Sequence, residues 1–198
     1  ARLDKYIGLI EADLAYKNDN VIFNDVNIFH ELYLLNFKGL IPFNFSFAPL
    51  EAVPGEGEVD MLIELSNVKP EILNYIFIDL PYIIWEKSIK RLPFEPKGGK
   101  ISGKMVITEN IDEPRFEGNL FGQELSGRLS FKNFDLNISD LKGNISFTNE
   151  EDVTIFNLGN INFFLENENS KAHISTGGFI RIEDTIEMAR LDLGLRKG

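Results

Sequence analysis

The sequence predicts an all-β protein made of antiparallel strands that share one continuous apolar surface. Three observations lead to this prediction. Apolar and polar residues alternate at every second position in many short runs, the pattern of half-buried strands. Clusters of Asn, Asp, Gly and Pro separate the runs, as turns do. Glycines recur on the apolar side of the runs.

The clearest alternation lies in residues 125–131, where Ser126, Arg128 and Ser130 are polar and the residues between them are apolar or glycine. Because successive side chains of a strand point to opposite faces, each run places its apolar residues together. We expect one apolar surface to be lined by Ile10, Leu14, Phe37, Phe45, Val59, Met61, Ile63, Leu65, Ile101, Met105, Ile107, Phe116, Leu120, Leu125, Leu129, Phe131, Leu141, Ile145, Phe147, Ile180, Ile182, Leu191 and Leu193.

The 198 residues are expected to form a single domain, 1–198. The runs number about thirteen or fourteen short strands, with turns at 18–20, 54–55, 110–114, 149–152 and 167–170. Residues 97–99 are a possible hinge. Because the chain has no initiator Met and no signal-type segment, we interpret it as a piece of a longer protein.

A glycine often occupies the apolar side in the pattern Φ-x-Gly-x-Φ, as at Gly103, Gly118, Gly127 and Gly143. Glycine inside a strand marks a bulge, a bend or the close approach of another backbone or a ligand. Two interpretations therefore stand. The glycines let the sheet bend around a narrow interior that accepts a ligand, or they are bulges that bend a barrel or sandwich.

One segment departs from the strand pattern. A helix start at Pro70 and apolar residues at helical spacing predict a short helical segment near residues 70–91. The segment is too short and too often interrupted to span a membrane. We expect it to pack on the sheet or to cap an open end, and a membrane-surface or gating role is the alternative.

The composition excludes several classes of partner. A net charge of −11 with no basic stripe argues against nucleic acid and against anionic membrane surfaces. The absence of cysteine excludes disulfides, thiolate metal sites and cysteine nucleophiles. His30 and His173 fit no metal-binding pattern.

No catalytic motif is found, so the chain is expected to be non-enzymatic and to need no cofactor or metal. Acidic clusters at 112–113 and 150–152 lie in predicted turns. A glycan-acting enzyme is nevertheless kept as one hypothesis, because a pair of carboxylates can converge in space without a sequence signature.

Residues 98–182 resemble the C-terminal, repeat-rich region of the TamB family, within the AsmA-like group. The resemblance depends on four glycine-centred runs: Gly99-Lys-Ile-Ser-Gly103-Lys-Met-Val-Ile-Thr108, Pro114-Arg-Phe-Glu-Gly118-Asn-Leu120, Leu125-Ser-Gly127-Arg-Leu129 and Leu141-Lys-Gly143-Asn-Ile145-Ser-Phe147. The chain departs from the family where Ile107-Thr108 replaces the Gly-Thr that often precedes the Pro strand.

The resemblance implies a long, U-shaped antiparallel β groove (a β-taco) that conducts phospholipid acyl chains across the periplasm of a diderm bacterium. It also implies a parent protein anchored in the inner membrane, an Omp85-type outer-membrane β-barrel partner and a role in outer-membrane biogenesis. The competing hypothesis is a structural or adhesive β-sandwich or solenoid with a dry core. Unpaired edges near 5–16 and 185–196 predict edge-to-edge self-association.

Overall fold

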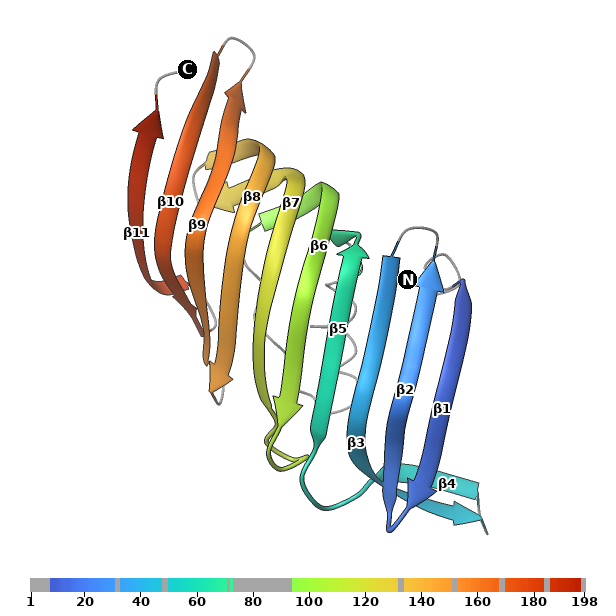
Figure 1. Ribbon diagram of the computed structural model, residues 1–198. Helices are drawn as coiled ribbons and strands as arrows, with labels where there is room; N and C mark the ends of the chain where they lie inside the picture. Colours follow the sequence, from blue (N-terminus) through green and yellow to red (C-terminus); the bar gives the residue numbers. More distant parts are fainter. Residues whose placement is uncertain are drawn as a thin grey trace.

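The computed structural model describes residues 8–30, 33–47, 50–70, 72, 94–131, 134–150, 153–167, 170–183 and 186–196. These residues form one open antiparallel β-sheet, which confirms the predicted all-β fold and fits a long β groove (Figure 1). The two edge strands, at opposite ends of the sheet, do not meet.

Consecutive strands are neighbours along almost the whole sheet, whose order is β1-β2-β3-β5-β6-β7-β8-β9-β10-β11. Strand β4 lies off this path and pairs only with β3. The strand bounds are β1 Leu9–Lys17, β2 Asn20–His30, β3 Tyr33–Phe47, β4 Leu50–Pro54, β5 Asp60–Val68, β6 Phe94–Thr108, β7 Arg115–Phe131, β8 Phe134–Glu150, β9 Val153–Asn167, β10 Ser170–Ile182 and β11 Ile186–Arg196.

The strands of the described residues are fewer and longer than the sequence predicts: eleven strands, of which β7 and β8 have 17 residues each. The number among the described residues is below the expected thirteen or fourteen because some pairs of runs form a single strand. Runs 116–120 and 125–131 both belong to β7, and runs 35–41 and 43–47 both belong to β3.

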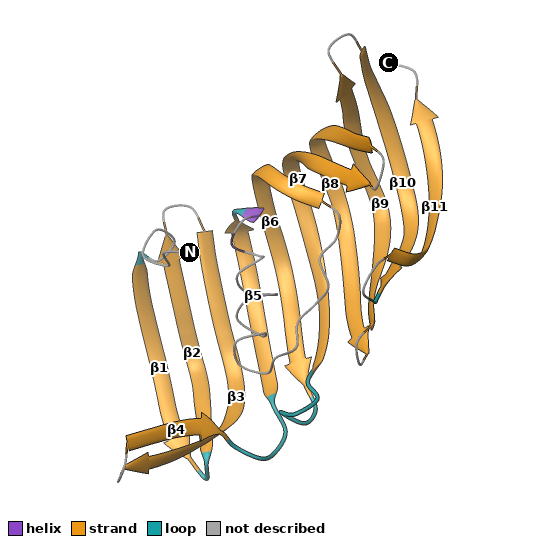
Figure 2. Ribbon diagram, turned by 180° about the vertical axis from the view of Figure 1, so that it is seen from behind, coloured by secondary structure: helices purple, strands orange, loops and turns teal. Residues whose placement is uncertain are grey.

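A line of β-bulges crosses the sheet where such runs join. Asn67, Glu124, Asp140 and Asn160 each have a φ near +50°, and each lies at a register shift between neighbouring strands. An extra residue in the left-handed conformation bends its strand and increases its twist. Beyond this line the ends of β6, β7 and β8 turn across the sheet (Figures 1 and 2).

Several glycines on the apolar side fit against the backbone of a neighbouring strand, whereas Gly118 fits against the Phe147 ring. Gly103 has a φ of +150°, and a side chain there would collide with the carbonyl oxygen of Asn119 on β7. Gly39 and Gly178 approach Asp60 and Arg190 in the same way. The close approach is therefore that of an adjacent strand, which supports the bending interpretation over direct contact with a ligand.

The hairpin of β3 and β4 crosses the ends of β1 and β2 (Figure 2), and its Phe45 contacts Tyr16, which shares a face of β1 with Leu14. Pro42 is buried at the bend of β3, and the Phe43 amide donates to the Asp19 carbonyl oxygen at 2.8 Å. The Tyr16 and Phe45 rings meet edge to face with centroids 5.0 Å apart. The hairpin therefore covers the part of the apolar face that lies beside the β1–β2 turn.

Two further expectations concern residues 70–99. Pro70 and Ile72 are helical directly after β5, and the rest of the predicted segment at 70–91 lies outside the described residues. The possible hinge at 97–99 lies within β6, where the register with β7 shifts between Pro96 and Gly98 and again between Gly98 and Lys100. There it forms part of the line along which the sheet bends.

Candidate functional site

The strand register builds an apolar ladder at the centre of the sheet. Met61 and Ile63 of β5 lie opposite Ile107 and Met105 of β6, respectively. Ile107 in turn lies opposite Phe116 of β7. Cross-strand neighbours on one face contact each other, so these residues form the centre of a single apolar cluster.

The ladder continues to both ends of the sheet without a change of face. Toward the C-terminal edge, Phe147 of β8 lies opposite Phe156 of β9, which lies opposite Ile180 of β10. Toward the N-terminal edge, Leu14 of β1 lies opposite Phe23 of β2. One apolar face thus extends over all ten strands of the path, roughly 43 Å at ~4.8 Å per strand.

The face is buried at its centre and exposed at its ends. Met105 and Phe116 are 0% exposed, whereas Ile10 on β1 is 50% exposed and Leu193 on β11 is 66% exposed. Between these extremes Leu120, Ile145, Leu158 and Ile180 are half-buried. The sheet therefore has a dry centre with apolar surface accessible toward both edges.

The structure brings nearly all of the predicted lining residues together on this face. Val59 lies just before β5 and is buried in the cluster, and Phe45 lies on the β3–β4 hairpin rather than on the main sheet. For Leu129 and Phe131 only the backbone register is described, and it continues the apolar side of β7. The register of the main sheet puts the remaining predicted residues with described side chains on this face.

Sequence reasoning missed the contributions of two strands. The apolar residues of β2 and β9 do not alternate evenly, because each strand contains a bulge that shifts the pattern by one residue. In β9 the left-handed Asn160 separates two alternating runs. The lining residues missed for this reason are Phe23, Val26, Ile28, Phe156, Leu158, Ile161, Phe163 and Leu165.

One polar contact interrupts the apolar face near the β8–β9 turn. The Thr154 hydroxyl donates to Asn149 Oδ1 at 3.1 Å, and both side chains are buried. Because both partners belong to the adjoining ends of β8 and β9, the hydrogen bond satisfies them locally.

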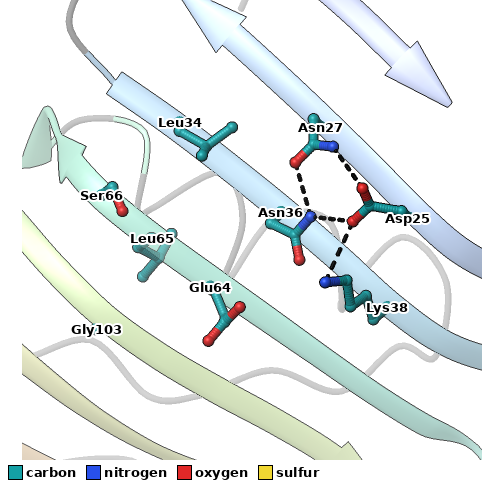
Figure 3. A pocket seen from close by; sticks show the side chains of 9 residues that line it. All are labelled: Asp25, Asn27, Leu34, Asn36, Lys38, Glu64, Leu65, Ser66 and Gly103. Carbon is teal, nitrogen blue, oxygen red and sulfur yellow. Dashed lines mark hydrogen bonds and ion pairs between the residues drawn. The ribbon is translucent and has the colours of Figure 1, made fainter.

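The opposite face is polar and holds a compact cluster on β2 and β3 (Figure 3). The Asn36 amide nitrogen donates to Asp25 Oδ1 and to Asn27 Oδ1, each at 2.7 Å. Lys38 Nζ lies 3.3 Å from Asp25 Oδ1. The cluster borders a shallow hollow of about 360 Å³ that also includes Glu64, and it stabilises the pairing of β2 with β3 at a bulge.

The hydrogen bonds of this cluster set the acid response of Asp25. Donation by Asn36 and Asn27, and then the nearby Lys38 ammonium, hold the pKa of Asp25 below its ordinary value. A lowered carboxyl pKa contributes stability that is present above the unfolded-state value of about 3.9 and is lost as the pH falls through the folded-state value.

We therefore expect the difference in unfolding free energy between the native chain and Asp25→Asn to shrink as the pH falls from 6 to 3. Urea unfolding at several pH values measures it. Asp112→Asn, in the turn between β6 and β7, serves as the control. An equal pH dependence for both variants would contradict the role assigned to Asp25.

The described residues contain neither a metal site nor a membrane-spanning helix. No three His, Cys, Asp or Glu side chains of the described ranges gather as a metal ion requires. No helix in the part of the chain that the structure describes is long and apolar enough to cross a membrane.

Comparisons with protein-family models, curated proteins and solved structures find no match.

Proposed function

We propose that the apolar face holds lipid acyl chains and that the chain is a segment of a longer, TamB-like lipid-conducting groove. In this proposal the parent protein is anchored in the inner membrane and lies in the periplasm of a diderm bacterium. It passes phospholipid toward the outer membrane, with an Omp85-type barrel as partner, and so supports outer-membrane biogenesis. The function requires no nucleophile, base or metal.

The observation that carries the proposal is the apolar face that extends over ten strands and is accessible toward both edges of the sheet. Burial of an acyl chain gains about 0.8 kcal/mol per methylene group, so about ten buried methylenes gain roughly 8 kcal/mol before the cost of ordering the chain. A lining of Ile, Leu, Val and Phe provides this gain without recognising a particular lipid. A conduit that moves lipids along its length needs such uniformity.

A second function is favoured by a different observation. Met105 and Phe116 are fully buried, as in a protein with a dry core. A structural or adhesive β module would use the central cluster for stability alone and would leave the exposed apolar ends for protein contacts. The two functions differ in what the half-buried part of the face contacts.

The discriminating substitution is Ile145→Asp. Ile145 lies on the apolar face and is only half-buried, whereas Met105 on the same face is fully buried. Water can hydrate a carboxylate at an accessible groove wall, so we expect the variant to fold and to bind a fluorescent fatty acid at least about tenfold more weakly. Asn144→Asp, one residue earlier and on the polar face, is the matched control.

Thermal melting followed by circular dichroism and titration with the fluorescent fatty acid make the measurement. A folded Ile145→Asp variant with weakened binding, beside an unaffected Asn144→Asp variant, supports the groove. Loss of the fold on Ile145→Asp favours the dry-core module. Unchanged binding in a folded variant would mean that acyl chains do not contact this face.

A further inference from the structure

Strand β11 contains a short sequence that is complementary to itself. Its central residues are Ala189, Arg190, Leu191, Asp192 and Leu193. The register with β10 places Ala189, Leu191 and Leu193 on the apolar face and the two charged residues on the polar face. Read outward from Leu191, a base and an acid occupy equivalent positions on its two sides.

Among the described strands, β11 is also an edge of the sheet. It is the last strand of the sheet, and within the described residues it pairs only with β10. An edge strand presents backbone donors and acceptors to any further strand. Leu191 is 40% exposed although it continues an apolar face that is buried elsewhere, and Arg190 and Asp192 are exposed beside it.

We propose that two copies of the chain form a dimer by antiparallel pairing of their β11 strands, with a two-fold axis at Leu191. In this register Arg190 of each copy lies opposite Asp192 of the second copy, which gives two ion pairs on the polar face. Ala189 of each copy lies opposite Leu193 of the second. A two-fold axis perpendicular to the sheet keeps each face on its own side, so the apolar face runs on across the interface.

The opposite edge does not have this complementarity where two β1 strands pair near their middle. Antiparallel pairing of two β1 strands about Ala12 would place Glu11 of each copy opposite Asp13 of the other, and both residues lie on the polar face. Like charges directly opposite each other destabilise a strand pair. A two-fold axis at Ala15 would set Asp13 opposite Lys17, but it would pair only residues 13–17 of β1, whereas the axis at Leu191 pairs all eleven residues of β11. Charge and length of overlap together therefore favour β11, whether or not the apolar face holds acyl chains.

The absence of native cysteine allows a clean cross-linking test on the full 198-residue chain. Leu191→Cys places a thiol on the two-fold axis, where facing Cα atoms of an antiparallel pair lie about 4.5–5.5 Å apart, within disulfide range. Leu193→Cys is the matched control, because in this register its two thiols lie four positions apart along the strands, roughly 13 Å. We expect oxidation to cross-link only the first variant.

Charge reversal provides the second measurement. In sedimentation velocity, Arg190→Asp is expected to weaken the dimer at least about tenfold, and the double variant Arg190→Asp with Asp192→Arg is expected to restore it. Circular dichroism verifies that each variant is folded. A folded Leu191→Cys variant that does not cross-link, or a folded Arg190→Asp variant that dimerises like the native chain, would overturn the proposal. Cross-linking between Ile10→Cys and Leu191→Cys proteins would likewise overturn it in favour of head-to-tail assembly.

Discussion

Phe116→Ala is expected to lower the free energy of unfolding by about 3–5 kcal/mol, the usual cost of removing a fully buried ring. Phe116 is 0% exposed near the start of β7 and lies opposite Ile107 in the central ladder. The fixed register of the sheet on both sides prevents the surroundings from closing the cavity. Urea unfolding followed by fluorescence or circular dichroism gives the value.

The same strand provides the control. Phe121 is 38% exposed on the polar side of β7, and Phe121→Ala is expected to cost less than about 1.5 kcal/mol. If both substitutions cost the same, the assignment of the apolar face to the Phe116 side would be contradicted.

Gly103→Ala is expected to destabilise the chain by about 2–4 kcal/mol. The new Cβ would collide with the Asn119 carbonyl oxygen, and the φ of +150° disfavours any side chain. Gly103 also lies next to the line of bulges, so the pairing of β6 with β7 must shift to relieve the collision.

Gly159→Ala is the matched control for this substitution. A Cβ at Gly159 would meet Asn144 atoms at 3.8 Å, an ordinary contact. We expect a change within about 1 kcal/mol, with stabilisation possible because alanine restricts the unfolded chain. Equal destabilisation by the two alanines would indicate that strand glycines act through flexibility alone.

The sequence predicts the all-β class and the apolar face well, because apolar and polar residues alternate at every second position wherever a strand is regular. Residues 125–131 illustrate this: their apolar side is the one that the register of β7 gives. The alternation fails at bulges, where one extra residue reverses the parity. Glu124 is the extra residue in β7, and for this reason the single strand β7 shows the alternation of two separate strands in the sequence.

Other features depend on contacts between segments that are distant in the sequence. No alternation or motif reveals the hydrogen bonds that Asn36 donates to Asp25 and Asn27, which exist only because β3 pairs with β2. The gradient of exposure along the apolar face has a similar origin. Met105 and Leu193 are both apolar residues at inward strand positions, and only their places in the sheet make one buried and the other exposed.

The central claim is that the apolar face holds acyl chains, and the most direct test is to identify what the purified chain carries. The measurement is native mass spectrometry of the chain purified without detergent, followed by lipid extraction. We predict stoichiometric phospholipid or another acyl-chain amphiphile, reduced in the folded Ile145→Asp variant and retained in Asn144→Asp. Repeated recovery of a folded protein with no bound amphiphile would contradict the claim.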